Sequence, residues 1–341
     1  MIEAQGLTKR YGDVVAVDDL SFSVRPGSVT GFLGPNGAGK TTTMRVALGL
    51  DRATAGTVTV AGRTYADQPA PVRTVGALLD ARAVDGGRTA RNHLRWMAAA
   101  AALPTERVDE VLDMVGLTAV ADQRIGGYSL GMSQRLGIAG ALLGDPPVLM
   151  FDEPVNGLDP EGIRWIRLLL RHLADEGRTV LVSSHLMSEL EATADRVLVI
   201  GNGRLLADTT VDELTRNGAG AHVRVVSPDL ASLQPRLESA GATVSPEPNQ
   251  TLRVVGLTSA EIGCIAAETG IVLHELTPHR ATLESVFLEL TGESVQYRST
   301  EVEIPPPPQP PPPPPPPPPP APSGIPAPPP PADVPSQGGG A

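Results

Sequence analysis

GPNGAGKT, residues 34–41, decides the fold of this chain, because it fits the pattern G-x-x-x-x-G-K-[ST] at every position. An apolar run, SVTGFL at residues 28–33, precedes it and an amphipathic run follows it, as in a strand, loop and helix. The glycines let backbone N–H groups turn inward around phosphate oxygens, and the helix N-terminus adds a partial positive charge. A plain turn before a helix is the alternative.

This loop predicts the contacts with a bound nucleotide. Lys40 is expected to reach the β- and γ-phosphates, and the Thr41 hydroxyl is expected to bind Mg²⁺. The residues expected to surround the phosphates are Gly34, Pro35, Asn36, Gly37, Ala38, Gly39, Lys40 and Thr41.

VLMFDE, residues 148–153, is a short apolar run that ends in two acids. Such a run is typical of a buried parallel strand. Asp152 at its end is positioned to hold Mg²⁺, and Glu153 is positioned to orient or deprotonate a water molecule. The alternative is a strand that simply ends in a solvated acidic turn.

Apolar strands and amphipathic helices alternate over the first ~215 residues, which predicts an α/β fold. Pro104 divides the helical spacing at residues 89–117 into two pieces. Strands are expected at 13–33, 56–63, 146–154 and 178–185. Helices are expected after the glycine-rich loop 34–41 (the P-loop), after Ser129 and at 161–176.

Residues 222–290 show a different pattern, which predicts a small α+β domain with a ferredoxin-like arrangement. Strands are expected at 222–227, 251–257 and 271–277, and helices at 230–241, 259–270 and 282–290. The predicted organisation is therefore an ATP-binding domain at 1–217, an accessory domain at 220–292 and a disordered proline-rich tail at 293–341.

The composition restricts the partners of the chain. The tail holds 22 of the 36 prolines, and is either a semi-rigid extension or a ligand for a proline-recognising domain. A net charge of −11 argues against nucleic acid and against direct docking on an anionic membrane. No run approaches the ~18–20 apolar residues that span a bilayer. The single cysteine, Cys264, excludes an intramolecular disulfide and is expected in the core.

Four motifs, GPNGAGKTT, LMFDEP, NGLD at 156–159 and SSH at 183–185, resemble in order and spacing those of ATP-binding-cassette ATPases. The resemblance implies a RecA-like core with a helical subdomain. YSLGM, residues 128–132, stands where this family places LSGGQ. It keeps Ser129 and Gly131 and differs from the family at its other three positions. In the family, this helix start faces the γ-phosphate of ATP held by the other subunit.

The resemblance also implies roles for single residues. Tyr11 would stack on the adenine and Thr42 would approach the α-phosphate, while Asp159 would lie at the subunit interface. His185 would contact the γ-phosphate. Asp80 stands where the family usually has a glutamine that links Mg²⁺ and the attacking water to the transporter, and as an acid it could still bind Mg²⁺.

The sequence therefore predicts the ATPase subunit of an ABC transporter. HRATLESVFLELTG near residue 290 and YSLGMSQRLGIA resemble ATPases of daunorubicin-, bacitracin- and lantibiotic-resistance exporters. The expected partners are a second copy of the chain and a separate permease at the cytoplasmic face of the membrane, with ATP and Mg²⁺ as ligands. The exported compound would be a drug, an antibiotic or a lipid-like molecule. A soluble cassette ATPase that acts on ribosomes or DNA is the alternative.

Overall fold

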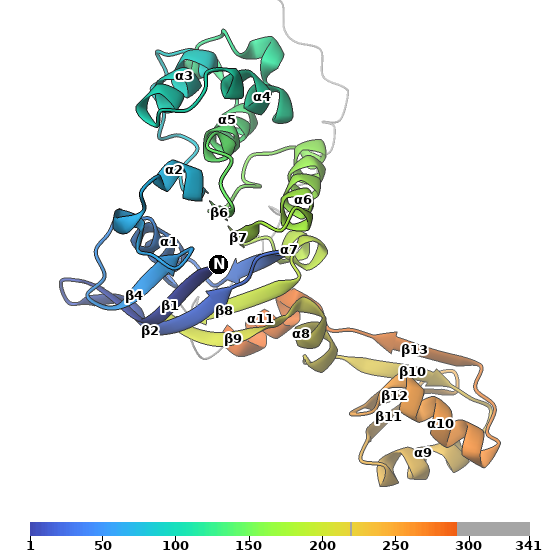
Figure 1. Cartoon of the computed structure of the whole chain (residues 1–341). Coiled ribbons are helices and arrows are strands. Elements are labelled where there is room, and N and C mark those ends of the chain that lie inside the picture. Colours follow the sequence, from blue (N-terminus) through green and yellow to red (C-terminus); the bar gives the residue numbers. More distant parts are fainter. Residues whose placement is uncertain (219, 292–341) are drawn as a thin grey trace, which may run out of the picture. The chain divides into compact units, whose positions relative to one another are not determined.

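The computed structural model describes residues 1–218 and 220–291 (Figure 1). Its centre is a six-stranded sheet in the order β5-β6-β7-β3-β8-β9, parallel except for the antiparallel pair β8–β9. The strands are β3 (Ser28–Leu33), β5 (Val75–Leu78), β6 (Val148–Phe151), β7 (Thr179–Ser183), β8 (Arg196–Gly201) and β9 (Arg204–Thr210). Every residue of β6 and β7 is buried, which confirms the predicted buried strand at VLMF. The carboxyl ends of β3, β6 and β7 therefore bring the predicted motifs to one edge of the sheet.

An antiparallel sheet in the order β2-β1-β4 packs beside the central one. In the sequence, α1 (Lys40–Ala47) connects β3 of the central sheet to β4 of the antiparallel sheet. The strands of the antiparallel sheet are β1 (Ile2–Tyr11), β2 (Val14–Val24) and β4 (Ala55–Val60). Phe22 of β2 contacts Phe32 of β3, with ring centroids 5.8 Å apart, in a core shared by both sheets. The structure thus adds β1, which the sequence pattern did not indicate.

The helical part consists of α3 (Ala90–Ala100), α4 (Glu106–Met114) and α5 (Leu130–Leu142). The break between α3 and α4 confirms the prediction at Pro104. Leu94, Leu112 and Leu136, one from each helix, are fully buried in a common core. A short helix, α2 (Pro71–Thr74), precedes β5.

Four more helices belong with the central sheet: α6 (Pro160–Asp175), α7 (Met187–Thr193), α8 (Val211–Asn217) and α11 (Leu283–Thr291). Leu283 and Phe287 of α11 lie in the same core cluster as Leu190 of α7. The Leu283 N–H also donates to Glu191 Oε2 at 3.0 Å. The chain therefore leaves the cassette after α8 and returns to it at α11.

Residues between these two helices form a four-stranded antiparallel sheet in the order β11-β12-β10-β13. Its elements are β10 (His222–Val226), α9 (Leu230–Ser239), β11 (Thr243–Glu247), β12 (Thr251–Val255), α10 (Ser259–Thr269) and β13 (Glu275–His279). This β-α-β-β-α-β order is the ferredoxin-like arrangement.

Three details of this region were predicted wrongly. β11 was missed, and β13 covers 275–279 instead of 271–277. Both are edge strands that contain a proline, Pro246 or Pro278, and proline weakens the strand pattern while an edge position tolerates it. Cys264 is exposed on α10, because the buried face of that helix is formed by Ile262 and Ala266.

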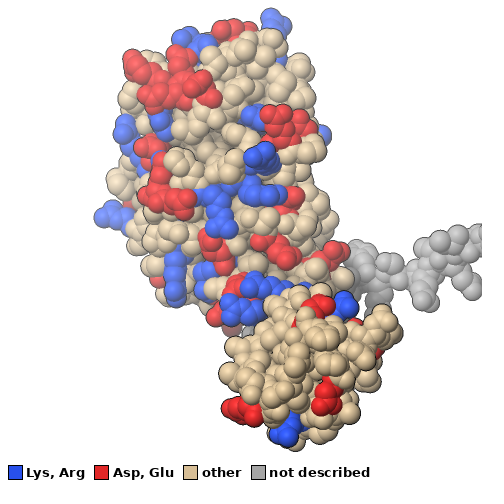
Figure 2. All heavy atoms as spheres, turned by 90° about the vertical axis from the view of Figure 1, so that its right-hand side faces the viewer, with Lys and Arg blue, Asp and Glu red and all other residues tan. Residues whose placement is uncertain are grey.

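Over the described part of the chain, no helix combines the length and the apolar character that a bilayer span requires. On the face shown in Figure 2, acidic and basic side chains are interspersed, and neither sign forms a continuous field. The predicted proline-rich tail lies outside the described residues.

Candidate active site

The loop between β3 and α1 forms one wall of a cavity of about 190 Å³, lined by Asn36, Gly37, Ala38, Gly39, Lys40, Thr41, Thr42, Asp152 and Glu153. Gly39 has a φ of 103°, and a Cβ there would lie 2.5 Å from the Ala16 carbonyl oxygen, so only glycine fits. Gly39 is also the N-cap of α1 and gives the helix no side-chain cap. The first N–H groups of α1 therefore have no side-chain cap partner at the end where an anion is favoured.

Lys40 is the cation of this cavity. Its side chain is 7% exposed, and its Nζ donates to the carbonyl oxygens of Gly34 and Pro35 at 2.6 and 3.2 Å. Burial lowers the pKa of Lys40, and the carboxylates of Glu153 and Asp152 oppose that shift. The ammonium is thus held by its own loop, beside the two acids that follow β6.

Asp152 is 8% exposed and is the hydrogen-bond acceptor for two hydroxyl groups. Thr41 Oγ1 donates to its Oδ2 at 2.6 Å, and Ser183 Oγ donates to its Oδ1. Two of the three predicted Mg²⁺ ligands, Thr41 and Asp152, are therefore in contact. Hydroxyl and carboxylate oxygens are the donors that Mg²⁺ prefers.

Glu153 and His185 form a pair at the mouth of the cavity. His185 Nδ1 lies 2.7 Å from Glu153 Oε2, and the His185 backbone N–H donates to the same oxygen at 3.3 Å. Glu153 has a φ of 51°, an unusual value for a residue with a side chain, and Pro154 follows it. Strained backbone of this kind concentrates at functional sites.

Two buried polar residues that the sequence did not indicate hold this strained peptide. The Glu153 N–H donates to Ser183 Oγ at 2.9 Å, and Gln134 Nε2 donates to the Glu153 carbonyl oxygen at 2.8 Å. Ser183 is the first residue of the SSH motif, in which only His185 was given a role, and Gln134 is a buried amide in an otherwise apolar helix face. Those positions are the signals from which both residues could have been found.

Tyr11 is 46% exposed at the end of β1, close to α1. Its hydroxyl donates to Asp51 Oδ2 at 2.8 Å, and Arg45 Nε donates to the same oxygen at 2.7 Å. The Lys9 ammonium lies 4.6 Å from the centre of the Tyr11 ring. Three charged or polar groups thus fix the ring that the sequence assigned to adenine.

The YSLGM stretch does not line the phosphate cavity. Ser129 is the N-cap of α5, and its Oγ accepts a hydrogen bond from the Met132 N–H at 3.2 Å, which confirms the predicted helix start. Leu130, which differs from the family pattern, packs against Gly157: a Cβ on Gly157 would lie 2.2 Å from Leu130 Cδ2. Ser129 and Leu130 are exposed, and Gly131 is half-buried.

Two further predicted residues also lie outside the cavity. Asp159 is the N-cap of α6, where its Oδ1 accepts from the Gly162 N–H at 2.8 Å. Asp80 follows β5, is exposed, and accepts a hydrogen bond from the Arg82 N–H at 2.8 Å. A single chain thus brings together the P-loop, Asp152, Glu153 and His185, but not Ser129, Gly131, Asp159 or Asp80.

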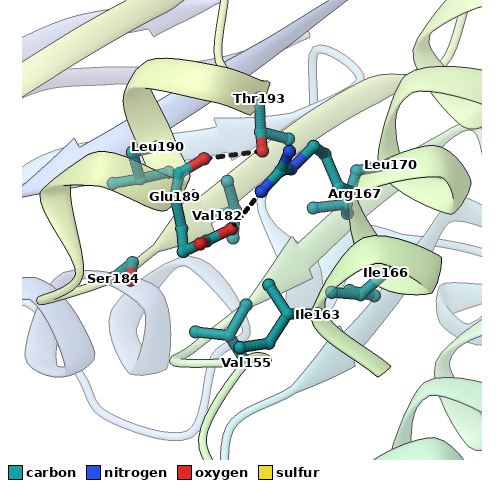
Figure 3. A pocket seen from close by; sticks show the side chains of 10 residues that line it. All are labelled: Val155, Ile163, Ile166, Arg167, Leu170, Val182, Ser184, Glu189, Leu190 and Thr193. Carbon is teal, nitrogen blue, oxygen red and sulfur yellow. Dashed lines mark hydrogen bonds and ion pairs between the residues drawn. The ribbon is translucent and has the colours of Figure 1, made fainter. Parts of the chain in front are cut away.

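A second cavity, of about 20 Å³, lies between α6, α7 and β7 and is lined in part by Ser184 (Figure 3). Arg167 Nη2 and Glu189 Oε2 form an ion pair at 2.6 Å, which links α6 to α7. The Thr193 hydroxyl donates to the Glu189 carbonyl oxygen at 2.7 Å. A space of this volume holds about one water molecule and has no room for a substrate. The ion pair beside it joins α6 to α7.

Comparison with known proteins agrees with this geometry. A family profile described as ABC transporter matches residues 17–156, and a domain of unknown function, DUF8746, matches residues 221–284. The bacitracin transport ATP-binding protein BcrA of Bacillus licheniformis is 41% identical over 219 residues, or 63% of this chain and 72% of BcrA.

The daunorubicin resistance ATP-binding protein DrrA2 of Streptomyces coeruleorubidus is 35% identical over 312 residues, which cover 86% of this chain and 96% of DrrA2. Among solved structures, the dimeric post-hydrolysis state of the ATP-binding cassette MJ0796, bound to ADP and Pi, matches with a TM-score of 0.57 at 23% identity. That match covers 62% of this chain and 99% of the MJ0796 chain. The chain therefore belongs to the ATP-binding proteins of ABC transporters and is an ATPase of that family.

Proposed function

We propose that two copies of this chain close on two ATP molecules and thereby drive a separate membrane permease that exports a compound. The observation that carries the proposal is the division of the site. The P-loop, Asp152 and Glu153 line one cavity and His185 contacts Glu153, whereas the start of α5 lies outside the cavity with Ser129 exposed. A second copy can supply that helix start, and the MJ0796 cassette was solved as a dimer.

Within each site, the residues of this chain divide the work of phosphoryl transfer. Lys40 and the N–H groups of α1 would hold the β- and γ-phosphates, and the ring of Tyr11 would stack on the adenine. Thr41 and Asp152 would hold Mg²⁺, which neutralises charge on the phosphate oxygens when bound. Among the described residues, no hydrogen bond or ion pair joins Asp80 to Thr41 or Asp152; Asp80 Oδ1 accepts from the Arg82 N–H, so its role as a Mg²⁺ ligand stays a prediction.

Glu153 would orient the attacking water and accept its proton. His185, 2.7 Å from the Glu153 carboxylate, would keep that carboxylate directed to the water and contact the γ-phosphate. In the dimer, Ser129 Oγ and the Gly131 N–H of the partner would approach the γ-phosphate from the opposite side, and Asp159 would lie at the interface.

The exporter role rests on the relatives. BcrA is named for bacitracin transport and DrrA2 for daunorubicin resistance, and the similarity to DrrA2 extends over 86% of this chain. The exported compound is accordingly proposed to be a drug, an antibiotic or a lipid-like molecule. Contact with the membrane would be indirect, through the permease.

A mixed dimer tests the shared site. Lys40→Ala removes the phosphate-binding cation, and Gly131→Asp puts a carboxylate where an anion must approach; either homodimer should be nearly inactive. In a dimer with one chain of each kind, one site carries both defects and the other carries none. We expect differently tagged, purified mixed dimers to regain ATP-dependent closure and turnover at that intact site, which neither homodimer shows. If signature and P-loop met within one chain, every site would carry a defect and mixing would restore nothing.

The permease is tested by copurification. A tagged Glu153→Gln chain, isolated from membranes of its host in ATP, should retain a multi-span membrane protein that ADP releases. Recovery of ribosomes or of DNA-stimulated ATPase activity would instead support the ribosome- or DNA-acting alternative.

A further inference from the structure

Gln134 is a buried amide on α5 that the nucleotide chemistry described above does not use. It is 4% exposed and lies five residues after Ser129, in the same helix. Its Nε2 donates to the carbonyl oxygen of Glu153 at 2.8 Å. The side chain therefore joins the helix whose start faces outward to the backbone of the acid beside the cavity.

The Glu153 peptide needs such a partner. Its φ of 51° lies in the left-handed region, and because Pro154 follows, the peptide bond after Glu153 carries no N–H for a compensating bond. Ser183 fixes the N–H side of Glu153 from β7, and Gln134 fixes the carbonyl side from α5. A displacement of this peptide by a few tenths of an ångström would also displace the Glu153 carboxylate, which His185 contacts.

A second contact between the same two segments makes α5 more than a passive support. Leu130, at the start of α5, fills the space left by the missing side chain of Gly157, and Gly157 follows Glu153 by four residues. The first part of α5 therefore contacts both ends of the segment 153–157, Glu153 through Gln134 and Gly157 through Leu130. A shift of α5 would reach Glu153 through Gln134 and through the Leu130–Gly157 contact together.

From this arrangement we infer that Gln134 is a positioning residue for hydrolysis, which sets the Glu153 backbone and couples it to the start of α5. The inference rests on the proposed function in one respect: it is the partner's ATP that would contact the start of α5. When α5 of one chain contacts the ATP held by its partner, it would then adjust Glu153 of its own chain, which serves the other site of the dimer. Gln134 acts through Glu153 and touches no nucleotide.

The test compares Gln134→Met with Arg135→Met in the full chain. Methionine keeps the length of glutamine and removes the donor. Arg135 donates to the Val115 carbonyl oxygen at 2.9 Å and lies over the Trp165 ring, and neither contact involves Glu153. Since a small misplacement of a catalytic group costs up to about 100-fold, we expect Gln134→Met to lower kcat roughly 10- to 100-fold and to change the ATP Kd less than about twofold. Arg135→Met should change kcat less than about twofold.

A second readout separates positioning from general damage to α5. In a Glu153→Gln background, we expect Gln134→Met to add no further loss of turnover and to leave the ATP-dependent dimer unchanged in size exclusion, because its target is already disabled. Loss of the dimer or of ATP binding in that background would show that Gln134 supports the helix start instead, and would overturn the inference. So would a normal kcat for Gln134→Met.

Failure of the proposed function gives a different pattern. If the parent Glu153→Gln chain formed no ATP-dependent dimer and the mixed dimers regained no turnover, the proposed shared site would be wrong. The effect of Gln134→Met on kcat would still report its action on Glu153 within one chain.

Discussion

The P-loop and the start of α5 are both helix N-termini built around small residues, yet their surroundings differ. At the P-loop, Lys40 and Thr41 are bonded within the chain, and the loop lines a cavity with Asp152 and Glu153. At α5, Ser129 bonds only to the first turn of its own helix among the contacts of the described residues, and it is exposed. One half-site is assembled by folding, and in the proposed function the other is completed by a second copy of the chain.

This difference has an energetic meaning. The polar groups of the P-loop half are fixed before ATP arrives, so their ordering cost belongs to folding and not to binding. In the proposed dimer, the α5 half would contribute only when two chains meet, so its contribution would depend on protein concentration and on the permease. ATP affinity of the single chain and turnover of the dimer should therefore respond to different residues.

The largest expected effect is on turnover. Glu153→Gln removes the base but keeps the shape of the side chain, so hydrolysis should fall by about 10²–10⁴ while ATP remains bound. The measurement is phosphate release together with nucleotide binding. Near wild-type turnover would show that another group orients the water, and the P-loop half would then be incomplete as described.

A smaller effect is expected on the affinity of the single chain. Lys40→Met keeps the length of the side chain but removes hydrogen bonds to charged phosphates, each worth about 1.5–3 kcal/mol, so ATP should bind roughly 10- to 100-fold more weakly. Calorimetric titration of dilute, monomeric protein provides the test. Gly131→Asp is the matched control from the other half, and an equal loss of affinity there would abolish the contrast between the two regions.

Asp51→Asn is expected to have a milder effect on the same half. It weakens the bonds that orient Tyr11, and one hydrogen bond is worth about 0.5–1.5 kcal/mol, so the ATP Kd should rise about 2- to 10-fold. Inorganic triphosphate has no base to stack, so its affinity for the Asp51→Asn variant should equal its affinity for the wild type. Weaker binding of both ligands would mean that Asp51 supports the P-loop helix and not the Tyr11 ring.

The smallest effect is expected at the start of α5 in the isolated chain. Ser129→Ala removes the N-cap hydrogen bond, which lowers the free energy of unfolding by about 1 kcal/mol and Tm by about 2–4 °C. ATP affinity of the monomer should stay the same. A change in that affinity would place Ser129 within reach of the nucleotide in its own chain.

The cassette fold could be predicted because its signals are local. The P-loop pattern, the apolar strand before Asp152 and the proline between α3 and α4 are each visible in a few consecutive residues, and each was found where expected. The pairing of Thr41 with Asp152 and of Glu153 with His185 followed from parallel strands that end at one edge of the sheet.

The remainder depends on packing between segments distant in sequence. Gln134 reaches Glu153 across 19 residues and Tyr11 reaches Asp51 across 40, and no spacing rule encodes such contacts. A proline hid the edge strand β11 and shifted the predicted bounds of the edge strand β13 for a different reason, because the sequence pattern for strands excludes a residue that edge positions accept. The packing of Leu130 on Gly157 could not be predicted either, because it depends on the position of Gly157 in the folded chain.

The return of the chain at α11 has a consequence for synthesis on the ribosome. Leu283, Phe287 and Leu290 of α11 belong to a core whose other members end at Leu214, so this core lacks part of its packing until α11 has been synthesised. At 5–20 residues per second, residues 218–291 take about 4–15 s to be translated. During that interval α7 and α8 lack the α11 side chains that pack on them. We therefore expect that the ferredoxin-like domain can fold before the core of the cassette is complete, and that a chaperone could act on the cassette in this interval.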